Sequence, residues 1–394
     1  MLISNDYPSY IKYMGSKSKI IDFVVDGINE VRDPGQPVLD LFSGSASLAG
    51  AVGQQTDFYS NDIQIYSGIL ADAYTKAWNA PGTPNSRDII NRAEAEVGRA
   101  SETIQDFLPL YSRDMNLETF VSYEEKQREL IDKNFNHDWH LFLKNYSGTW
   151  WSAYQCLWID AIRKEIENYR EHPVYPVLMS SLMFAMAYCS QGTGHYAQYR
   201  DAKTISSMKD ISIYRFREIS QYFSRKYNEA VSLLSKKPPT NISLSSSLDF
   251  TESLNEFEGG VIYADPPYCF VHYSRFYHAL ETLVLYDYPE LQVKGGKTVK
   301  GRYRVDRHQS PFSIRSKVSG AFQELFRGVL ETDSKLVLSY SNTGMISLEE
   351  LSDIANTIFR GRNMELLSMD YQHMTLGRQG IRHRDVKECL LLVK

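Results

Sequence analysis

The four residues Asp265-Pro266-Pro267-Tyr268 form the clearest chemical pattern in the chain. They follow an apolar run, residues 259–264, which predicts a strand, and open α/β sheets place their chemistry at the carboxyl ends of strands. Because proline fixes φ and lacks an N–H group, the turn holds a carboxylate, a carbonyl and an aromatic ring rigidly. Asp265 and the Pro266 carbonyl can accept the two hydrogens of an exocyclic amine, while Tyr268 stacks on the ring that carries it.

A second pattern, residues 37–51, is typical of a cofactor-binding turn. An apolar run that ends at Asp40 predicts a short buried strand, and the small residues 43–47 predict a turn into a helix. Asp62 stands about twenty residues further on, where the second strand of a nucleotide-binding unit ends and an acidic side chain meets a ribose. Two alternatives stay open: the turn binds nothing, or Asp62 caps a helix that begins at Ile63.

Size and composition set limits on the fold and on the partners. With 394 residues, 43% of them hydrophobic, the chain suits two domains or one large domain with an insertion. A net charge of −5 excludes a uniformly basic surface and leaves local basic patches as candidates for nucleic-acid contact. The four cysteines lack CxxC spacing, so we expect no metal site and no disulfide framework. The longest apolar run, residues 177–189, is too short to span a bilayer, and we expect a cytoplasmic protein without a membrane partner.

A large insertion is expected between the two chemical patterns. Asp40 and Asp265 lie 225 residues apart, whereas one strand–helix unit needs about 30 residues. The insertion, residues 81–241, is largely helical in pattern, and its apolar residues, Trp151 and Trp158 among them, recur at helical spacing. We expect these tryptophans to lie in the core.

The remaining segments, 1–80 and 242–394, predict one α/β domain with a mixed, mostly parallel sheet. Residues 335–341 predict another buried strand. Residues 364–375 and 386–393 predict a terminal hairpin with a basic tip.

Three basic segments are candidates for contact with a nucleic acid. The loop 190–203 gathers glycines, aromatics and cations without periodicity, and we expect it to read bases. Residues 294–317 hold eight Lys and Arg residues against one acid, and their glycines predict a mobile loop that closes on phosphates. The third segment is the tip of the terminal hairpin. The expected contacts are His195, Arg200 and Lys203 in the first segment, Arg302, Arg304 and Arg307 in the second, and Arg378, Arg382 and Arg384 in the third.

These patterns, in this order, resemble those of the α-type adenine-specific (N6) DNA methyltransferases of bacteria and phages, the DPPY class. The turn 265–268 resembles the catalytic motif of that family in its Asp form, which is typical of adenine-N6 enzymes. Residues 10–17 resemble the N-terminal Lys-Trp-x-Gly-Gly-Lys motif, with Tyr13 in place of Trp and Ser16 in place of the second Gly. Residues 384–388 resemble a terminal element that supports the flipped base.

The resemblance implies a fold, a reaction and partners. The fold is the Rossmann-like sheet of the class I S-adenosylmethionine methyltransferases, with a target-recognition domain inserted at 81–241. The reaction moves a methyl group from S-adenosylmethionine to N6 of an adenine flipped out of duplex DNA, yields S-adenosylhomocysteine and needs no metal. The implied partners are double-stranded DNA and cognate restriction or phage-defence proteins.

The resemblance also implies site residues. Lys17 is expected to hold the cofactor's carboxylate, Asp62 its ribose, and Asp249 with Phe250 its adenine. The implied catalytic residues are Asp265, Pro266, Pro267 and Tyr268. The implied cofactor-binding residues are Tyr10, Lys12, Tyr13, Gly15, Lys17, Asp40, Phe42, Ser43, Gly44, Asp62, Ile63, Asp249, Phe250 and Asp265.

Two alternative functions stay open from the sequence. An RNA adenine methyltransferase would use the same chemistry, because local charge does not distinguish A-form from B-form helices. A catalytically silent nucleic-acid-binding module would keep the fold, although the intact turn at Asp265 and the acid at Asp62 argue against silence. A restriction fusion would need a nuclease motif, and we find no convincing one.

Overall fold

The main sheet has seven strands, in the order β3-β2-β1-β4-β7-β9-β8. The structure is a computed structural model, and it describes residues 1–192, 194–372 and 385–394. The strands are β1 (Val38–Asp40), β2 (Phe58–Asn61), β3 (Ser243–Ser246), β4 (Val261–Ala264), β7 (Lys335–Ser341), β8 (Met364–Gln372) and β9 (Asp385–Val393). The first five strands in this order are parallel, and β9 runs antiparallel to β7 and to β8. The predicted mixed, mostly parallel sheet and the terminal hairpin are confirmed.

Helices cover both faces of the sheet, because successive strand residues point to opposite sides. Val261 and Tyr263 of β4 join the core on one face, whereas Ile262 and Ala264 join the core on the other. The helices of the first face are α1 (Ile21–Val31), α2 (Ser47–Val52) and α3 (Ile65–Thr75). Those of the second face are α11 (Phe250–Asn255), α14 (Val318–Glu331) and α15 (Leu348–Ile358).

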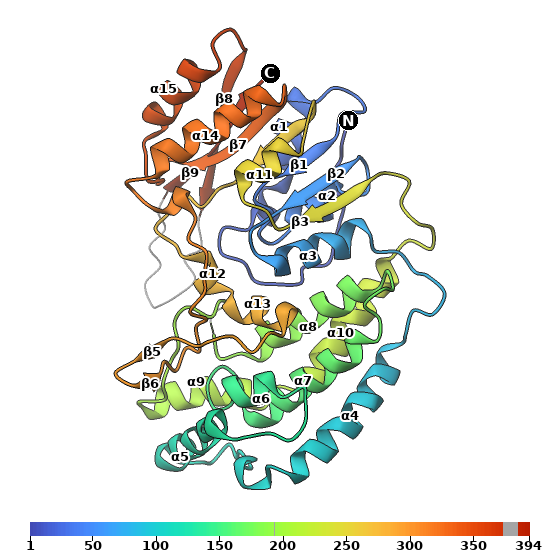
Figure 1. Ribbon diagram of the computed structural model, residues 1–394, viewed down its shortest axis with the longest axis vertical. Coiled ribbons are helices and arrows are strands. Elements are labelled where there is room, and N and C mark those ends of the chain that lie inside the picture. Colours follow the sequence, from blue (N-terminus) through green and yellow to red (C-terminus); the bar gives the residue numbers. More distant parts are fainter. Residues whose placement is uncertain (193, 373–384) are drawn as a thin grey trace.

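A helical part lies below the sheet in Figure 1, between α3 and β3 in the chain. It consists of α4 (Ser86–Glu102), α5 (Leu117–Arg128), α6 (Leu141–Tyr146), α7 (Ala153–Glu167), α8 (Tyr175–Cys189), α9 (Ile205–Arg215) and α10 (Ile219–Leu233), with short 3-10 turns at Gln105–Phe107 and Glu129–Asp132. Its helix α8 packs on α3, so the helical part and one face of the sheet share a continuous apolar core. The expected helical character is confirmed, as is the burial of Trp151 and Trp158. The domain boundaries stay a prediction.

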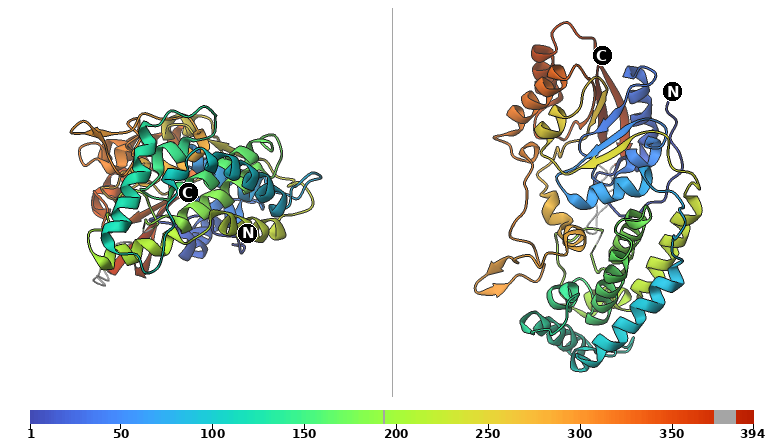
Figure 2. Two further views of the ribbon diagram at one scale, coloured as in Figure 1. Left: turned by 90° about the horizontal axis from the view of Figure 1, so that it is seen from below. Right: turned by 45° about the vertical axis from the view of Figure 1, so that its right-hand side comes forward.

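The segment between β4 and β7 connects the two parts. It contains α12 (Tyr273–Phe276), α13 (His278–Leu285), the small hairpin β5 (Val293–Lys294) and β6 (Lys297–Thr298), and a 3-10 turn at Pro311–Ser313. The hairpin projects from the body in the right-hand view of Figure 2.

Beyond the hairpin, the chain is held against the helical part by buried aromatic side chains. Trp150 Nε1 donates a hydrogen bond to the carbonyl of Gly301 (2.9 Å), and the Tyr303 hydroxyl donates to the carbonyl of Ala197 (2.6 Å). The expectation of a mobile loop over 294–317 is therefore wrong for residues 301–304, because burial of Tyr303 and its neighbours fixes the backbone there. In the part of the chain that the structure describes, no helix has the length and apolarity needed to cross a membrane.

Candidate active site

The site forms where the strand order reverses. From β1 the chain continues to β2 on one side, and the later strand β4 pairs with β1 on the other. Such a switch point opens a crevice at the carboxyl ends of the two central strands. Asp40 ends β1 and Asp265 follows β4 directly, so the sheet brings together two acids that are 225 residues apart.

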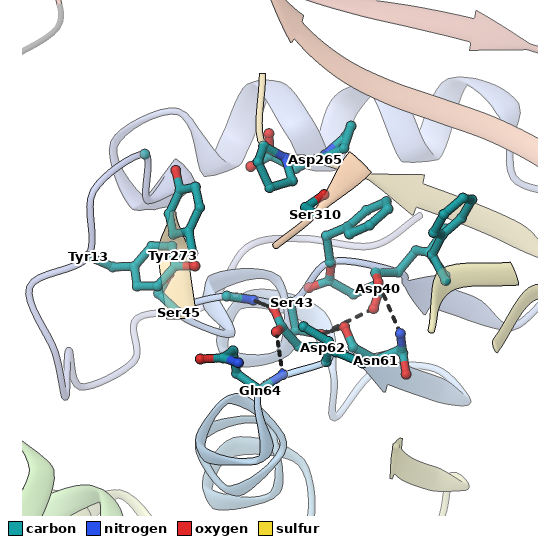
Figure 3. A pocket seen from close by; sticks show the side chains of 18 of the residues that line it. Tyr13, Asp40, Ser43, Ser45, Asn61, Asp62, Gln64, Asp265, Tyr273 and Ser310 are labelled. Atoms are coloured by element: carbon teal, nitrogen blue, oxygen red, sulfur yellow. Dashed lines mark hydrogen bonds between the residues drawn. The ribbon is translucent and has the colours of Figure 1, made fainter. Parts of the chain in front are cut away.

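A pocket of about 1110 Å³, including the solvent at its mouth, opens at this point (Figure 3). All four predicted catalytic residues line it, and so do all predicted cofactor residues except Tyr10 and Lys12. The mixed polar and apolar lining suits a nucleoside ligand.

Tyr10 and Lys12 lie elsewhere, which corrects their assignment to the cofactor site. The Tyr10 side chain is buried, with its ring 5.3 Å from that of Tyr74. The Lys12 ammonium lies 4.4 Å from the ring centre of Tyr188, on the helical part. Alternation along an extended segment explains the error, because Tyr13 faces the pocket while its neighbour Lys12 points away.

Asp62 holds the cofactor turn in shape. Its two carboxylate oxygens accept the backbone N–H groups of Gly44 and Gln64, each at 2.9 Å (Figure 3). Burial raises the pKa of Asp62 to about 6, against the lowering effect of these two hydrogen bonds. The first amides of α3 are instead bound by Glu281, which accepts from Ile65 and Tyr66 at 3.1 Å. Asp62 is therefore not needed as the cap of α3, and each of its oxygens keeps a lone pair for a ligand.

The far end of the pocket combines an acid with aromatic rings. Asp249 uses only Oδ1 locally, accepting from the backbone N–H (3.1 Å) and the hydroxyl (2.8 Å) of Thr251. The ring of Phe250 packs 6.0 Å from Phe42 and 5.2 Å from Phe312. Aromatic rings beside a carboxylate in the pocket wall suit an aminated heterocycle.

The catalytic turn is connected to a buried network of charges. The Lys17 ammonium lies 3.1 Å from Asp265 Oδ1 and 2.5 Å from Glu388 Oε1. The same Glu388 oxygen accepts from the Ser339 hydroxyl at 2.7 Å. Lys17 is thus paired with two carboxylates, and its expected contact with the cofactor's carboxylate stays a prediction. Its ammonium also lies 5.1 Å from the ring centre of Tyr268.

The pocket is acidic and contains polar atoms without partners. Burial raises the pKa of Asp265 to about 7; the Lys17 charge opposes this rise and the Glu388 charge adds to it. Burial, followed by the charges of Asp265 and Asp62, holds the pKa of Asp40 well above its usual range. Oδ1 of Asp40 is buried without a hydrogen-bond donor among the described residues, and Oδ1 of Asp265 has only the Lys17 ammonium beside it, at 3.1 Å. A cationic or hydrogen-bonding ligand would satisfy these atoms.

The model of the D12 class N6 adenine-specific DNA methyltransferase family matches residues 13–354. This stretch holds the cofactor turn, the helical part and the catalytic turn in one match. The chain belongs to this family.

Curated relatives of this D12-class chain are modification methylases. The LlaI methylase of Lactococcus lactis subsp. lactis is 23% identical over 377 residues, which are 94% of this chain and 53% of the relative. The StsI methylase of Streptococcus sanguinis is 24% identical over 352 residues, 87% of this chain and 46% of the relative. The Type II methyltransferase M.FokI of Planomicrobium okeanokoites is 23% identical over 375 residues, 92% and 49% of the two chains. The chain thus spans about half the length of these relatives.

The structure buries several residues that were expected to contact DNA. His195 is buried, with its ring 4.5 Å from that of Phe276. Arg302 and Arg304 are buried as well, and Arg304 forms a bidentate pair with Asp287 at 2.8 and 2.6 Å. A buried guanidinium with a carboxylate partner does not attract phosphate, so Arg304 is excluded as a DNA contact. Burial excludes Arg302 and His195 as DNA contacts as well.

The other expected DNA contacts are placed differently. Arg200 is half-buried and donates to the carbonyl of Gln191 at 2.9 Å, whereas Lys203 is exposed. Arg307 is half-buried, next in the chain to His308 of the pocket wall. Their contacts with DNA stay predictions. Arg378, Arg382 and Arg384 lie outside the described residues.

Sequence reasoning missed several residues of the candidate site. Asn61 binds the backbone N–H of Leu248 at 3.0 Å and so joins the cofactor turn to the Asp249 segment. Glu388 binds both Lys17 and Ser339 next to the catalytic turn. The feature of the sequence that could have revealed it is an acidic residue directly before the apolar segment 389–393. His308 lines the pocket from a segment whose basic composition suggested another role.

Gly44 is predicted to be essential for the shape of the cofactor turn. It has φ +50°, and a Cβ there would lie 2.9 Å from the Tyr13 ring. Gly44→Ala should lower the free energy of unfolding by about 1–2 kcal/mol and weaken S-adenosylmethionine binding at least roughly tenfold. Gly35→Ala is the matched control, since Gly35 has φ +86° with nothing within 4 Å. Calorimetry should show normal cofactor affinity for Gly35→Ala; an equal loss in both variants would contradict the prediction.

Proposed function

We propose that this chain is a site-specific DNA adenine-N6 methyltransferase that uses S-adenosylmethionine and acts on an adenine flipped out of duplex DNA. The observation that carries the proposal is the catalytic turn itself, whose Asp265 lines the pocket with only the Lys17 ammonium, among the described residues, against its Oδ1 at 3.1 Å. An amine is the group that this oxygen and the neighbouring Pro266 carbonyl would bind. Membership of the D12 class favours adenine in DNA as the carrier of that amine.

The cofactor part of the pocket fits S-adenosylmethionine. When bound, S-adenosylmethionine supplies a methyl group on a positively charged sulfonium. The carboxylates of Asp40, Asp62 and Asp265 all line the pocket, and a cation among them would relieve their mutual repulsion. Asp62 would bind the ribose hydroxyls with its remaining lone pairs. Asp249 Oδ2 and the Phe250 ring would bind the adenine.

The residues of the catalytic turn prepare the target amine for attack. The lone pair of adenine N6 is delocalised into the ring, and positive charge builds on this nitrogen during methyl transfer. Asp265 and the Pro266 carbonyl would accept the amino hydrogens and stabilise that charge, in a geometry fixed before the reaction. Lys17 would hold the Asp265 carboxylate in place through the 3.1 Å ion pair, so it acts as a positioning residue. Base flipping is required because N6 is inaccessible inside the stacked duplex.

Mapping of N6-methyladenine in DNA from cells that express this chain tests the function directly. We expect methylation at one short recognition sequence, absent from cells that express the Asp265→Ala variant. Unmodified DNA would contradict the proposal. Methylation of RNA alone would favour the RNA alternative, and binding without methylation would favour the silent module.

The names of the relatives suggest the biological setting. LlaI and StsI are modification methylases, and M.FokI is a Type II methyltransferase. We infer that this chain likewise protects DNA beside a cognate restriction or phage-defence protein, in the cytoplasm of a bacterium. A strain whose DNA resists a cognate endonuclease only when it carries the active chain would support this setting.

Tyr268 should act through its ring. The ring packs edge-on against Tyr340, with centroids 5.8 Å apart, and lines the pocket beside Asp265. Tyr268→Phe should keep most of the methylation rate, whereas Tyr268→Ala should lose stacking worth roughly 1–3 kcal/mol per base. Both variants are checked by measuring the methylation rate, with 2-aminopurine fluorescence as a reporter of base flipping. Equal damage from the two changes would point to the hydroxyl instead.

A further inference from the structure

A cluster of two arginines and two histidines borders the pocket on the side of α12. It consists of His272, Arg275, Arg307 and His308, and Figure 1 shows α12 between the sheet and the helical part. His308 itself lines the pocket, and so does Ser274, the neighbour of Arg275. Each of the two arginines is therefore the neighbour in sequence of a residue that lines the pocket, and the two belong to different segments.

Hydrogen bonds tie these two segments together. The Ser274 hydroxyl donates to the carbonyl of His308 and lies 2.9 Å from Nδ1 of His272. The Arg275 guanidinium lies over the ring of Tyr303, 4.3 Å from the ring centre. Tyr303 is buried and its hydroxyl is bonded to the helical part, so Arg275 rests on a fixed surface. The cluster is held by the fold and does not depend on a bound partner.

The charges of the two arginines are not balanced by acids among the described residues. Neither Arg275 nor Arg307 forms an ion pair with any side chain that the structure describes, and Nε of Arg307 is buried without a hydrogen-bond partner. The nearby cations differ: Arg304 is paired with Asp287, and Lys300 lies 2.9 Å from Asp201. Asp306 is exposed and forms no ion pair with a described residue. Burial and the charge of Arg275 lower the pKa of Arg307, which indicates that like charges have been brought together.

We propose that Arg275 and Arg307 form the phosphate-binding site for the phosphodiester beside the flipped adenine. This inference rests on the proposed function. A flipped nucleotide stays attached to the DNA backbone, so a base held on Tyr268 brings its own phosphates to the edge of the pocket. Arginine suits this task, because its planar fork binds phosphate oxygens bidentately. Contacts to phosphate position the duplex without reading its sequence.

The salt dependence of DNA binding tests the site. Each phosphate contact releases counterions, so Arg275→Gln and Arg307→Gln should each reduce the slope of log affinity against log salt by roughly 0.9. The effect should be the same on a random-sequence duplex as on a methyl-accepting one. Arg275→Lys and Arg307→Lys keep the charge and should keep most of the slope. Arg99→Gln, an exposed and ion-paired cation on α4, is the control and should leave the slope unchanged.

Two measurements separate this inference from its competitors. Cofactor affinity, measured by calorimetry, should be unchanged in both glutamine variants; a loss of cofactor affinity with an unchanged salt slope would assign the cluster to the cofactor's carboxylate and overturn the inference. A loss of DNA affinity that is confined to the methyl-accepting duplex would indicate that the arginines read bases, and it would also overturn the inference. Because the random duplex needs no methylation, a wild-type chain that binds DNA with the expected slope but never methylates it would refute the proposed function alone.

Discussion

Replacing Asp265 by Ala or Asn is expected to reduce the rate of DNA methylation by at least roughly 100- to 1000-fold, the loss typical when one preorganised electrostatic partner of a transition state is removed. The carboxylate lines the pocket and keeps lone pairs beyond its ion pair with Lys17, so its proposed role is exercised only when the amine is present. Asn keeps the shape and one acceptor but loses the charge. We therefore expect the Asn variant to be nearly as inactive as the Ala variant.

Cofactor binding serves as the control for the Asp265 variants. The ribose and adenine contacts proposed for Asp62 and Asp249 are untouched, so affinity for S-adenosylmethionine should change only severalfold. Single-turnover rates with saturating DNA and cofactor measure the chemical step, and calorimetry measures binding. Near-normal turnover in either variant would remove Asp265 from the catalytic assignment, whatever happens to affinity.

The catalytic turn could be predicted from the sequence because all of its residues are adjacent in the chain. Four adjacent residues fix the geometry, two of them prolines, and the preceding apolar run predicted the strand β4. The cofactor turn was equally local, and its acid Asp62 was found by spacing from Asp40. The partner of Lys17 was not predictable in this way. Glu388 lies 371 residues further along the chain and reaches Lys17 only because β9 pairs with β7 next to β4.

The basic segment 294–317 shows why composition alone misled. Its charge suggested a mobile phosphate-binding loop, but charge counts do not reveal pairing. Asp287 neutralises Arg304, and Trp150 holds the backbone at Gly301; both partners lie outside the segment. Sequence patterns describe neighbours along the chain, whereas the burial that removed these cations from the surface depends on tertiary packing.

Substitutions of Lys17 and of Glu388 are expected to shift the pH dependence of the methylation rate in opposite directions. Asp265 must be ionised to stabilise charge on the amine, so the rate should fall as the pH drops below its pKa, which is about 7 in the free protein. Lys17 favours the ionised carboxylate, hence Lys17→Met should move the acid limb of the pH–rate profile upward by roughly 1–3 units. Glu388 disfavours it, hence Glu388→Gln should move the limb downward. Both variants should also be slower, because the carboxylate loses support for its position.

The direction of the two shifts distinguishes an electrostatic network from simple loss of structure. Misfolding or weak cofactor binding would lower the rate at every pH and leave the position of the limb unchanged. Lys12→Met is the matched control, since it removes a cation five residues away whose ammonium lies over Tyr188 outside the pocket, and it should not move the limb. Profiles of kcat/KM for DNA from pH 5 to 9, with the thermal stability of each variant checked, make the measurement. Shifts in the same direction for Lys17→Met and Glu388→Gln would show that the two charges do not act on Asp265, and the positioning role would have to be abandoned.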